Sequence, residues 1–182
     1  MYNNLEELKQ SFINCQKCKL CSTRQNIVFG VGNEKADIMF IGEGPGGDED
    51  RIGEPFVGKA GQLMNKAFDI LGIKREEVYI ANIVKCRPPN NRDPEEDEVN
   101  ACMDYLRQQV MIIKPKIIVL LGRIALQNIL GKEYKITASR GQWVEKKGIR
   151  YMPTWHPAAL LRDETKKIEF LSDLKKVVSM RG

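Results

Sequence analysis

The run Lys116-Ile117-Ile118-Val119-Leu120-Leu121, closed by Gly122, is the most apolar of the chain. Ala36-Asp37-Ile38-Met39-Phe40-Ile41, closed by Gly42, is similar, and residues 78–84 form a third run. Short apolar runs of this kind are typical of strands buried on both faces. Residues 141–153 have the pattern of a strand with a turn, and helical patterns cover residues 5–13, 58–72, 94–113, 123–130 and 165–180. Strands that alternate with helices predict an α/β fold, with three layers (α/β/α) around a mostly parallel, four-stranded central sheet.

The length and composition predict one globular domain over residues 1–182. The chain is 42% hydrophobic and 29% charged, which is close to the average of globular proteins. Residues 1–35 hold a helix and a cysteine segment that lead into the first strand. No apolar run approaches the roughly 18 residues that cross a bilayer, and the first residues lack the blocks of a signal peptide. We therefore expect a monomer in the cytoplasm, with no membrane partner.

The charge is unevenly distributed. Residues 1–113 carry 14 Lys and Arg against 18 Asp and Glu, whereas residues 114–182 carry 15 against 6. A basic C-terminal third favours a polyanionic partner, most simply nucleic acid. The same distribution is equally compatible with an uneven surface on an ordinary globular protein.

The chain has five cysteines, an odd number that argues against a disulfide framework. Cys15-x-x-Cys18 forms a chelating pair, and Cys86 and Cys102 lie further along the chain. Four thiolates suit zinc and an iron–sulfur cluster equally well by count. Cys21 adds a second possible pair with Cys18. Burial of the thiols without a metal is the remaining alternative.

Unusual polar residues follow three of the predicted strands. Gly42-Glu43-Gly44-Pro45-Gly46 follows the first, Asn82 lies near the end of the second, and His156, the only histidine, comes after the last. Ligands of parallel sheets bind outside the carboxyl ends of the strands, so these segments are expected to converge on one pocket. The glycine loop matches neither a Walker loop nor a dinucleotide motif, and an ordinary strand-to-helix turn is the simpler alternative. A carboxylate there can orient a water molecule or stabilise a positive charge.

Two leucines beside a basic residue follow the histidine. If they are exposed, Leu160 and Leu161 next to Arg162 are apolar wedges of the kind that unstack DNA. Alternatively, both leucines begin the buried face of the last helix.

Taken together, these residues resemble the iron–sulfur, or family 4, uracil-DNA glycosylases of the uracil-DNA glycosylase superfamily. The resemblance covers nearly the whole chain. Its four blocks are Cys15-x-x-Cys18-x-Leu20; Gly42-Glu43-Gly44-Pro45-Gly46 continuing through Glu49-Asp50 to Gly53-x-Pro55-Phe56-Val57-Gly58-Lys59-Ala60-Gly61; Asn82-Ile83-Val84-Lys85-Cys86-Arg87-Pro88-Pro89-Asn90-Asn91-Arg92; and His156-Pro157-Ala158-Ala159-Leu160-Leu161-Arg162. The resemblance implies a DNA repair enzyme that flips uracil out of DNA and hydrolyses its N-glycosidic bond.

The resemblance also implies a cofactor and a set of roles. A [4Fe-4S] cluster would be held by Cys15, Cys18, Cys86 and Cys102, with Cys21 as a bystander, and would clamp the N-terminal segment to the helix that carries Cys102. Catalysis would fall to Glu43 and His156. Uracil would be bound by Gly42, Gly44, Glu49, Phe56 and Asn82. DNA would be contacted by Pro157, Ala158, Leu160, Leu161, Arg162, Lys85 and Arg87.

The implied roles follow base chemistry. Phe56 would stack on the extruded base, and the Asn82 amide would donate to O4 and accept from N3–H of uracil. Glu49 would lie near the C5 edge, and His156 would donate to O2 of the departing base. Glu43 would face the sugar or its attacking water. Because Gly44 stands where the better-known branch of the superfamily has an aspartate, dissociation with little help from a base stays open.

Two alternatives differ in function class. A non-catalytic, zinc-stabilised nucleic-acid-binding module would keep the cysteines and the basic third but would not use Glu43, Asn82 or His156. The second alternative is a superfamily relative that acts on other deaminated bases or that forms a covalent DNA adduct. The adduct-forming relatives carry an inserted basic loop before the last motif, and none is evident here.

Overall fold

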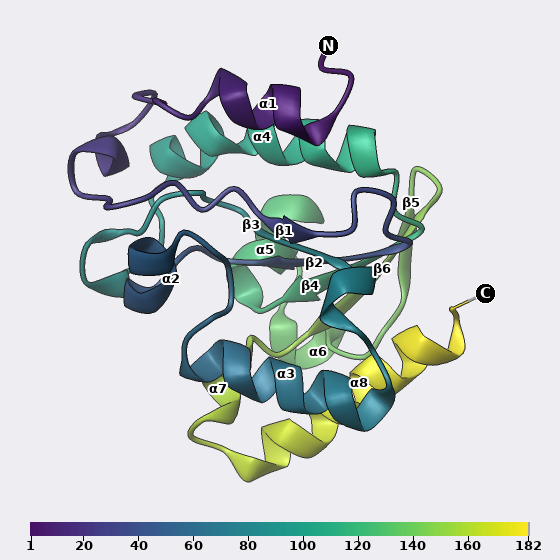
Figure 1. The fold of residues 1–182 in the computed structure, drawn as a ribbon. Helices are drawn as coiled ribbons and strands as arrows, with labels where there is room; N and C mark the ends of the chain where they lie inside the picture. The colour runs from purple at the N-terminus through teal and green to yellow at the C-terminus, as the bar shows by residue number, and fades with distance from the viewer. Residues whose placement is uncertain (182) are drawn as a thin grey trace.

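The computed structural model describes residues 1–181 and contains a six-stranded sheet in the order β1-β3-β2-β4-β6-β5 (Figure 1). The strands are β1 (Val31–Gly32), β2 (Ile38–Gly42), β3 (Tyr79–Asn82), β4 (Ile117–Leu121), β5 (Val144–Lys146) and β6 (Ile149–Thr154). The four neighbours β3, β2, β4 and β6 are parallel, and β1 and β5 are antiparallel edge strands. The mostly parallel sheet is confirmed. The prediction of four strands was wrong, for two reasons. The strand β1 has only two residues, too few to give a pattern in the sequence. The predicted strand with a turn at residues 141–153 is a hairpin of two strands.

Helices cover both faces of the sheet, which confirms the three-layer prediction. In Figure 1, α1 (Leu5–Ser11) and α4 (Glu96–Ile113) lie above the sheet, and α3 (Lys59–Leu71), α7 (Pro157–Leu160) and α8 (Glu164–Ser179) lie below it. The strand residues alternate between these two layers. In β4, Ile118 and Leu120 pack with α1 and α4, whereas Val119 packs with α3 and α8.

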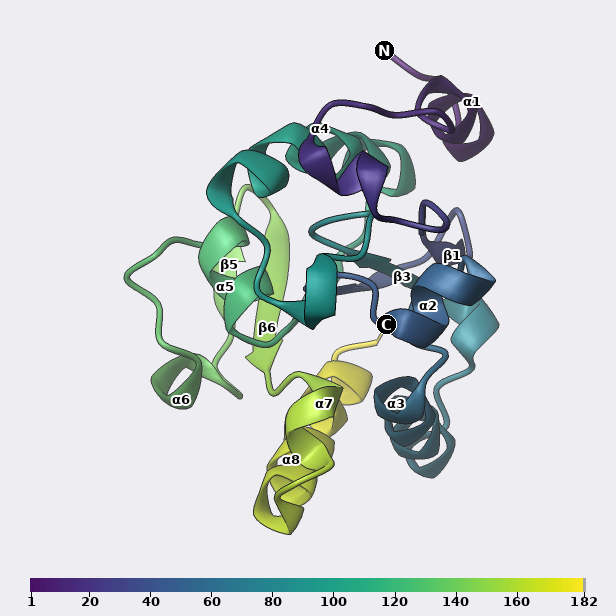
Figure 2. The same cartoon turned by 90° about the vertical axis from the view of Figure 1, so that its left-hand side faces the viewer.

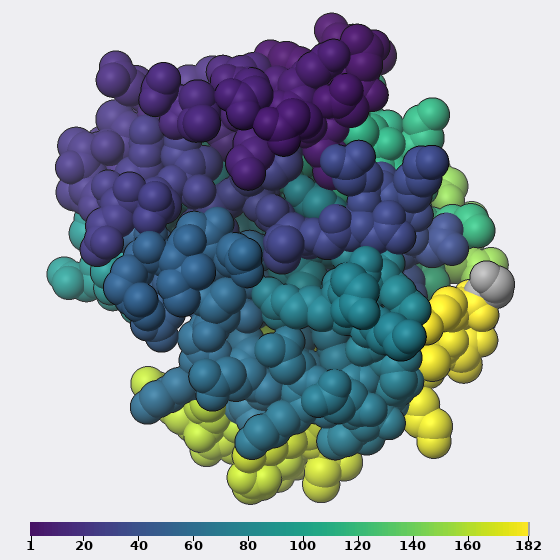
Figure 3. Space-filling model, viewed as in Figure 1, coloured from purple at the N-terminus to yellow at the C-terminus, as the bar shows by residue number. Residues whose placement is uncertain are grey.

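The remaining helices are short. They are α2 (Gly47–Ile52), α5 (Arg123–Ile129), α6 (Ile136–Ser139) and the 3-10 turns η1 (Lys19–Ser22), η2 (Arg75–Glu77) and η3 (Pro89–Asn91). Figure 2, which faces the carboxyl end of the parallel strands, shows α2, α5 and α7 around it. In the space-filling view, the N-terminal residues cover the upper part of the molecule (Figure 3).

Local sequence signals explain several helix ends. Asn4 caps α1 by accepting a hydrogen bond from the Glu7 amide at 2.8 Å. Gly72 ends α3 in a left-handed conformation, with φ of 69°. Pro94 was expected within the first turn of a helix, but α4 begins only at Glu96, with Glu95 as its cap.

None of the helices within residues 1–181 combines the length and apolar character that a bilayer-spanning helix requires.

Candidate active site at the carboxyl end of the sheet

A pocket of about 420 Å³ opens where the parallel strands end. Its walls come from the loop after β2, the segment before α3, the end of β3, the loop before α4 and the start of α7. The structure brings together in this pocket six residues that the resemblance assigned to catalysis or uracil binding. They are Glu43, Gly44, Glu49, Phe56, Asn82 and His156. The expected convergence of three strand ends is therefore present, while the role of each residue stays a prediction.

Asn82 points its side chain into the floor of the pocket. It lies opposite Gly42 in the β2–β3 ladder and is 2% exposed. A Cβ atom at position 42 would lie 2.6 Å from Asn82 Oδ1 and 2.6 Å from the Phe56 ring, so glycine leaves the room that both side chains occupy. Asn82 Oδ1 is buried and has no hydrogen-bond partner within residues 1–181. Buried polar atoms are nearly always paired, so this acceptor is available to a ligand.

Phe56 forms one wall of the pocket from a strained backbone. Its φ is 52°, a conformation that is unfavourable for a bulky residue, and its ring is 5.5 Å from that of His156. Gly61, in the first turn of α3, permits this arrangement, because a Cβ atom there would lie 2.0 Å from the Phe56 carbonyl oxygen. Strained residues are retained where the surroundings enforce them, often at functional sites.

His156 presents a neutral N–H group to the pocket. Its Nδ1 accepts a hydrogen bond from the Ala158 amide at 3.0 Å, so the ring proton of the neutral form is on Nε2. Burial lowers the pKa of His156 to about 4, with the Glu49 charge opposing the shift. Gly122 packs directly against the histidine, since a Cβ atom there would lie 2.9 Å from His156 Cβ. The imidazole is therefore an uncharged donor at neutral pH.

Glu49 ties the two halves of the pocket rim together. Its Oε2 accepts hydrogen bonds from the amides of Val57 at 2.9 Å and Gly58 at 2.7 Å, and its Oε1 accepts one from Gly46 at 3.1 Å. These bonds connect the loop after β2 to the segment that carries Phe56. Glu49 thus shapes the pocket through its backbone partners.

Glu43 is half-buried beside a second carboxylate. Burial, helped by the charge and hydrogen bonding of Asp93 and opposed by Arg123, raises the pKa of Glu43 to about 7. Arg123 in turn pairs with Asp93 at 2.6 Å. Glu43 is therefore poised to exchange a proton near neutral pH.

The residues predicted to touch DNA divide into exposed and buried groups. Ala158, Leu161 and Arg162 are exposed at the pocket rim or just beyond it, and Leu161 is 49% exposed. Leu160 is 2% exposed and packs in the core beneath α7, so its assignment as a DNA wedge is wrong and the alternative of a buried leucine holds for it. Pro157 is also buried, as the first residue of α7.

The assignment of Lys85 to DNA contact is also wrong. Lys85 is 1% exposed, and its ammonium group donates to Asn82 O at 3.0 Å and to Gln109 Oε1 at 2.6 Å. Burial lowers the pKa of Lys85 to about 7. The resemblance assigned this position to DNA contact, but α4 covers it. Arg87, by contrast, is half-buried near the rim and donates to Asn91 Oδ1 at 2.8 Å.

Four of the cysteines come together from three segments. Burial raises the pKa of the Cys102 thiol, and the neighbouring Cys18 and Cys15 add to the rise. Burial raises the pKa of Cys86 to about 12, and Cys102 and Cys18 act in the same direction. All five cysteines are free thiols. Within residues 1–181, no three metal-binding side chains are already arranged as a metal-binding group.

Three thiols already accept hydrogen bonds of the kind that stabilise thiolates. The Tyr105 hydroxyl donates to Cys15 Sγ at 3.3 Å, and the Lys85 amide donates to Cys102 Sγ at 3.3 Å. The Arg24 guanidinium lies 3.5 Å from Cys86 Sγ. Soft sulfur donors with such partners fit an iron–sulfur cluster or a zinc ion.

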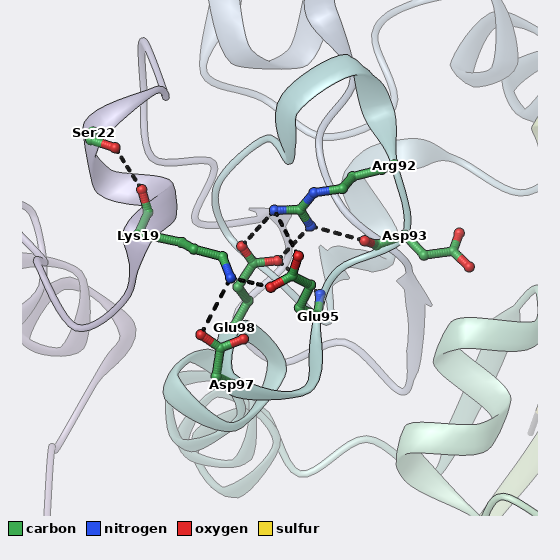
Figure 4. Close-up of polar contacts among 7 residues, drawn as sticks. All are labelled: Lys19, Ser22, Arg92, Asp93, Glu95, Asp97 and Glu98. Carbon is green, nitrogen blue, oxygen red and sulfur yellow. Dashed lines mark hydrogen bonds and ion pairs between the residues drawn. The ribbon is translucent and has the colours of Figure 1, made fainter.

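Ion pairs fasten the cysteine segment to the start of α4. Lys19, which follows Cys18, contacts Glu95 and lies 3.7 Å from Asp97 (Figure 4). Arg92 binds the buried Glu98 carboxylate through two bonds, at 2.7 and 3.0 Å, and these bonds lower the pKa of Glu98. The pairs hold in place both the segment near the cysteines and the loop that carries Asp93.

Sequence reasoning missed Asp93 and Arg123. Arg123 directly follows Gly122 at the carboxyl end of β4, so the rule that located Glu43, Asn82 and His156 would have found it too. Asp93 had no comparable signal, because only the path of the loop before α4 brings it to Glu43.

Several known proteins similar to this chain are named type-4 uracil-DNA glycosylases. The family model described as the uracil DNA glycosylase superfamily matches residues 29–175. A type-4 uracil-DNA glycosylase of Sulfurisphaera tokodaii is 49% identical over 184 residues, which cover 96% of this chain and 84% of that protein. The type-4 uracil-DNA glycosylase of Archaeoglobus fulgidus is 44% identical over 98% of this chain and 94% of its own length. That of Thermotoga maritima is 43% identical over 96% of this chain and 93% of its own length.

Proposed function

The chain belongs to the uracil DNA glycosylase superfamily, among the type-4 uracil-DNA glycosylases, and we propose that the pocket at the carboxyl end of its sheet is where uracil is removed from DNA. The enzyme is a DNA repair hydrolase that cleaves the N-glycosidic bond of uracil and leaves an abasic site. The observation that carries the assignment of the site is Oδ1 of the pocket residue Asn82, which is buried and has no hydrogen-bond partner within residues 1–181.

Recognition of uracil rests on one ring and one amide. Stacking on Phe56 is worth roughly 1–3 kcal/mol but does not distinguish one base from another. The Asn82 amide accepts from N3–H of uracil through Oδ1 and donates to O4 through Nδ2. Cytosine presents the opposite pattern on this edge, so its binding would leave buried polar groups unpaired. The hydrogen bonds that Glu49 makes to the pocket rim support a role for Glu49 in excluding the C5 methyl group of thymine.

Cleavage uses groups on both sides of the scissile bond. The C1′–N1 electron pair leaves with uracil, and the Nε2–H of neutral His156 donates to O2, where negative charge develops. A water oxygen then bonds to C1′, and its proton passes to the Glu43 carboxylate. A pKa of about 7 suits Glu43 to this exchange at neutral pH.

DNA reaches the pocket along its rim. A base inside a duplex must be flipped out, at a cost of a few kcal/mol. The exposed Leu161 and Arg162 would fill and brace the gap. Ala158 lines the pocket, and Arg87 lies beside Gly47 of the pocket lining. Leu161 thus takes the wedge role without Leu160.

We infer that Cys15, Cys18, Cys86 and Cys102 hold a [4Fe-4S] cluster. The cluster would supply a covalent tie between the N-terminal segment and α4, beside the Lys19 and Arg92 ion pairs. Cys21→Ser should leave broad visible absorption near 400 nm intact, whereas Cys102→Ser should bleach it. A colourless protein that carries zinc would instead support the binding-module alternative.

The decisive experiment is an assay on the anaerobically purified full chain, with an oligonucleotide that contains one uracil. We expect free uracil in the supernatant and an alkali-sensitive abasic site in the strand. His156→Ala should slow the single-turnover step strongly while DNA binding persists. An unchanged strand after long incubation with the wild-type protein would refute the proposed function. The proposal further includes one domain that acts as a monomer in the cytoplasm, and a sizing column tests the monomer.

A further inference from the structure

We propose that Asp93 and Arg123 are positioning residues for Glu43: Arg123 holds the Asp93 carboxylate beside that of Glu43, and this pair sets the pH above which Glu43 can accept a proton. The inference rests on the proposed function, because it assigns the tuning of the same site. Neither residue belongs to the four sequence blocks that carry the resemblance.

Three separate strand and loop ends bring the groups together. Glu43 follows β2, Arg123 begins α5 directly after β4, and Asp93 lies in the loop before α4. Arg123 Nη2 lies 2.6 Å from Asp93 Oδ2. The carboxylates of Glu43 and Asp93 are close enough to share a hydrogen bond when one of them is protonated.

The backbone of Asp93 is anchored independently of Glu43. Arg92 donates to the Asp93 carbonyl at 3.0 Å while it also binds the buried Glu98. In Figure 4, the Asp93 carboxylate points away from this cluster of ion pairs. It is therefore free to face Arg123 and Glu43, and its position is fixed from behind.

Asp93 and Arg123 act on Glu43 in opposite directions. A neighbouring negative charge favours the protonated form of a carboxyl group, and a positive charge favours the ionised form. Asp93 raises the pKa of Glu43, after burial, and Arg123 lowers it. The other titratable side chains that line the pocket are Asp48, Glu49, Lys59, Arg92 and His156. Of the charged groups around the pocket, Asp93 and Arg123 are the ones that act on Glu43.

This arrangement has a consequence for the reaction. Glu43 can take the proton of the attacking water only while it is ionised, so the rate should rise with pH through the pKa of Glu43. The Asp93 carboxylate also gives the arriving proton a second oxygen to bond, which orients Glu43. Loss of either partner should therefore move the pH profile, and the two losses should move it in opposite directions.

The test measures single-turnover uracil release at saturating enzyme between pH 5.5 and 9. We expect the wild-type rate to rise with a midpoint near 7, and Glu43→Gln to abolish the rise. Asp93→Asn should shift the midpoint down, and Arg123→Gln should shift it up, each by about one pH unit. Asp104→Asn and Arg107→Gln are matched controls, because this exposed pair on α4 lies 3.8 Å apart and changes the same charges.

Each outcome decides the inference. The inference about Asp93 and Arg123 would be overturned by equal midpoints in all variants, by shifts in the same direction, by shifts equal to those of the controls, or by a rise that survives Glu43→Gln. In each of these cases, uracil release by the wild type would still uphold the proposed function. No release by the wild type at any pH would instead refute the proposed function. Titration of ¹³C-labelled glutamate carboxyls by NMR, with Glu43→Gln to identify the signal, should show the same opposite shifts without any substrate.

Discussion

Replacement of Asn82 by alanine separates recognition of the base from stability of the fold. The side chain is 2% exposed, yet its Oδ1 has no partner within residues 1–181. Removal of that oxygen therefore breaks no hydrogen bond of the free protein at this atom. The space that opens is continuous with the pocket, which already borders Asn82. We expect the free energy of unfolding to change by less than about 1 kcal/mol.

The same change should be costly in the complex with DNA. Uracil would lose the acceptor for N3–H and the donor for O4, and each buried group left unpaired costs about 1–3 kcal/mol. We take about 3 kcal/mol for both, because water can enter the vacated space and pair with one of them. Since 1.36 kcal/mol corresponds to a factor of ten, kcat/KM should fall roughly 150-fold.

The assay compares kcat/KM for uracil release with the urea unfolding curve of the same preparation. Asn128→Ala is the matched control, because Asn128 is an exposed residue on α5 whose amide donates only to Ile124 O. The control should leave both quantities near their wild-type values. If Asn82→Ala kept kcat/KM within threefold of the wild type, or lost activity only in proportion to a fall in stability, the amide would not be the recognition group.

Three further predictions test the supports of the pocket. Asp173→Ala should lower the free energy of unfolding by about 3–5 kcal/mol, because the fully buried carboxylate accepts a hydrogen bond from Thr154 Oγ1 at 2.7 Å and pairs with Arg140. Urea unfolding measures this loss, with Asp104→Ala as the exposed control. Gly61→Ala should cost about 2 kcal/mol and displace Phe56, because its Cβ atom would lie 2.0 Å from the Phe56 carbonyl; a thermal midpoint equal to that of Gln62→Ala would contradict this. Because the pKa of His156 is about 4 in the folded chain, the unfolded chain binds one more proton than the folded chain between about pH 4 and 6.5. The wild type should therefore lose stability relative to His156→Gln as the pH falls through that range. Urea unfolding at several pH values measures the difference.

The buried centre of the sheet could be predicted from the sequence because its residues are apolar on both faces. Ile117–Leu121 appears within one residue of its predicted position, and Ile38–Gly42 within two. The edges were harder to predict, since β1 has two residues and β5 has one half-buried residue followed by two exposed ones. Edge strands carry little hydrophobic pattern, so only the pairing in the folded chain defines them.

The convergence of the pocket residues followed from a topological rule, whereas the residues expected to contact DNA came from the resemblance and from a pair of leucines. Strand ends meet at one edge of a parallel sheet, which located Glu43, Asn82 and His156. The rule is silent about which side chains a neighbouring helix covers. Gln109 of α4 lies over Lys85, so a charged residue that the resemblance assigned to DNA contact is bound within the core. Leu160 is buried in the same way beneath α7.

The position of each recognition group depends on a glycine elsewhere in the chain. Gly42 leaves room for Asn82 and the Phe56 ring, Gly61 lets α3 approach the Phe56 carbonyl, and Gly122 lets β4 approach His156. In each case the functional residue packs closely against a strand or helix backbone, which yields less than a flexible side chain would. The distance between the stacking ring and the two polar groups is thereby set by the sheet and α3 rather than by rotamer choice. A pocket held in this way would bind a planar base of one size without reorganisation, as the proposed uracil site requires.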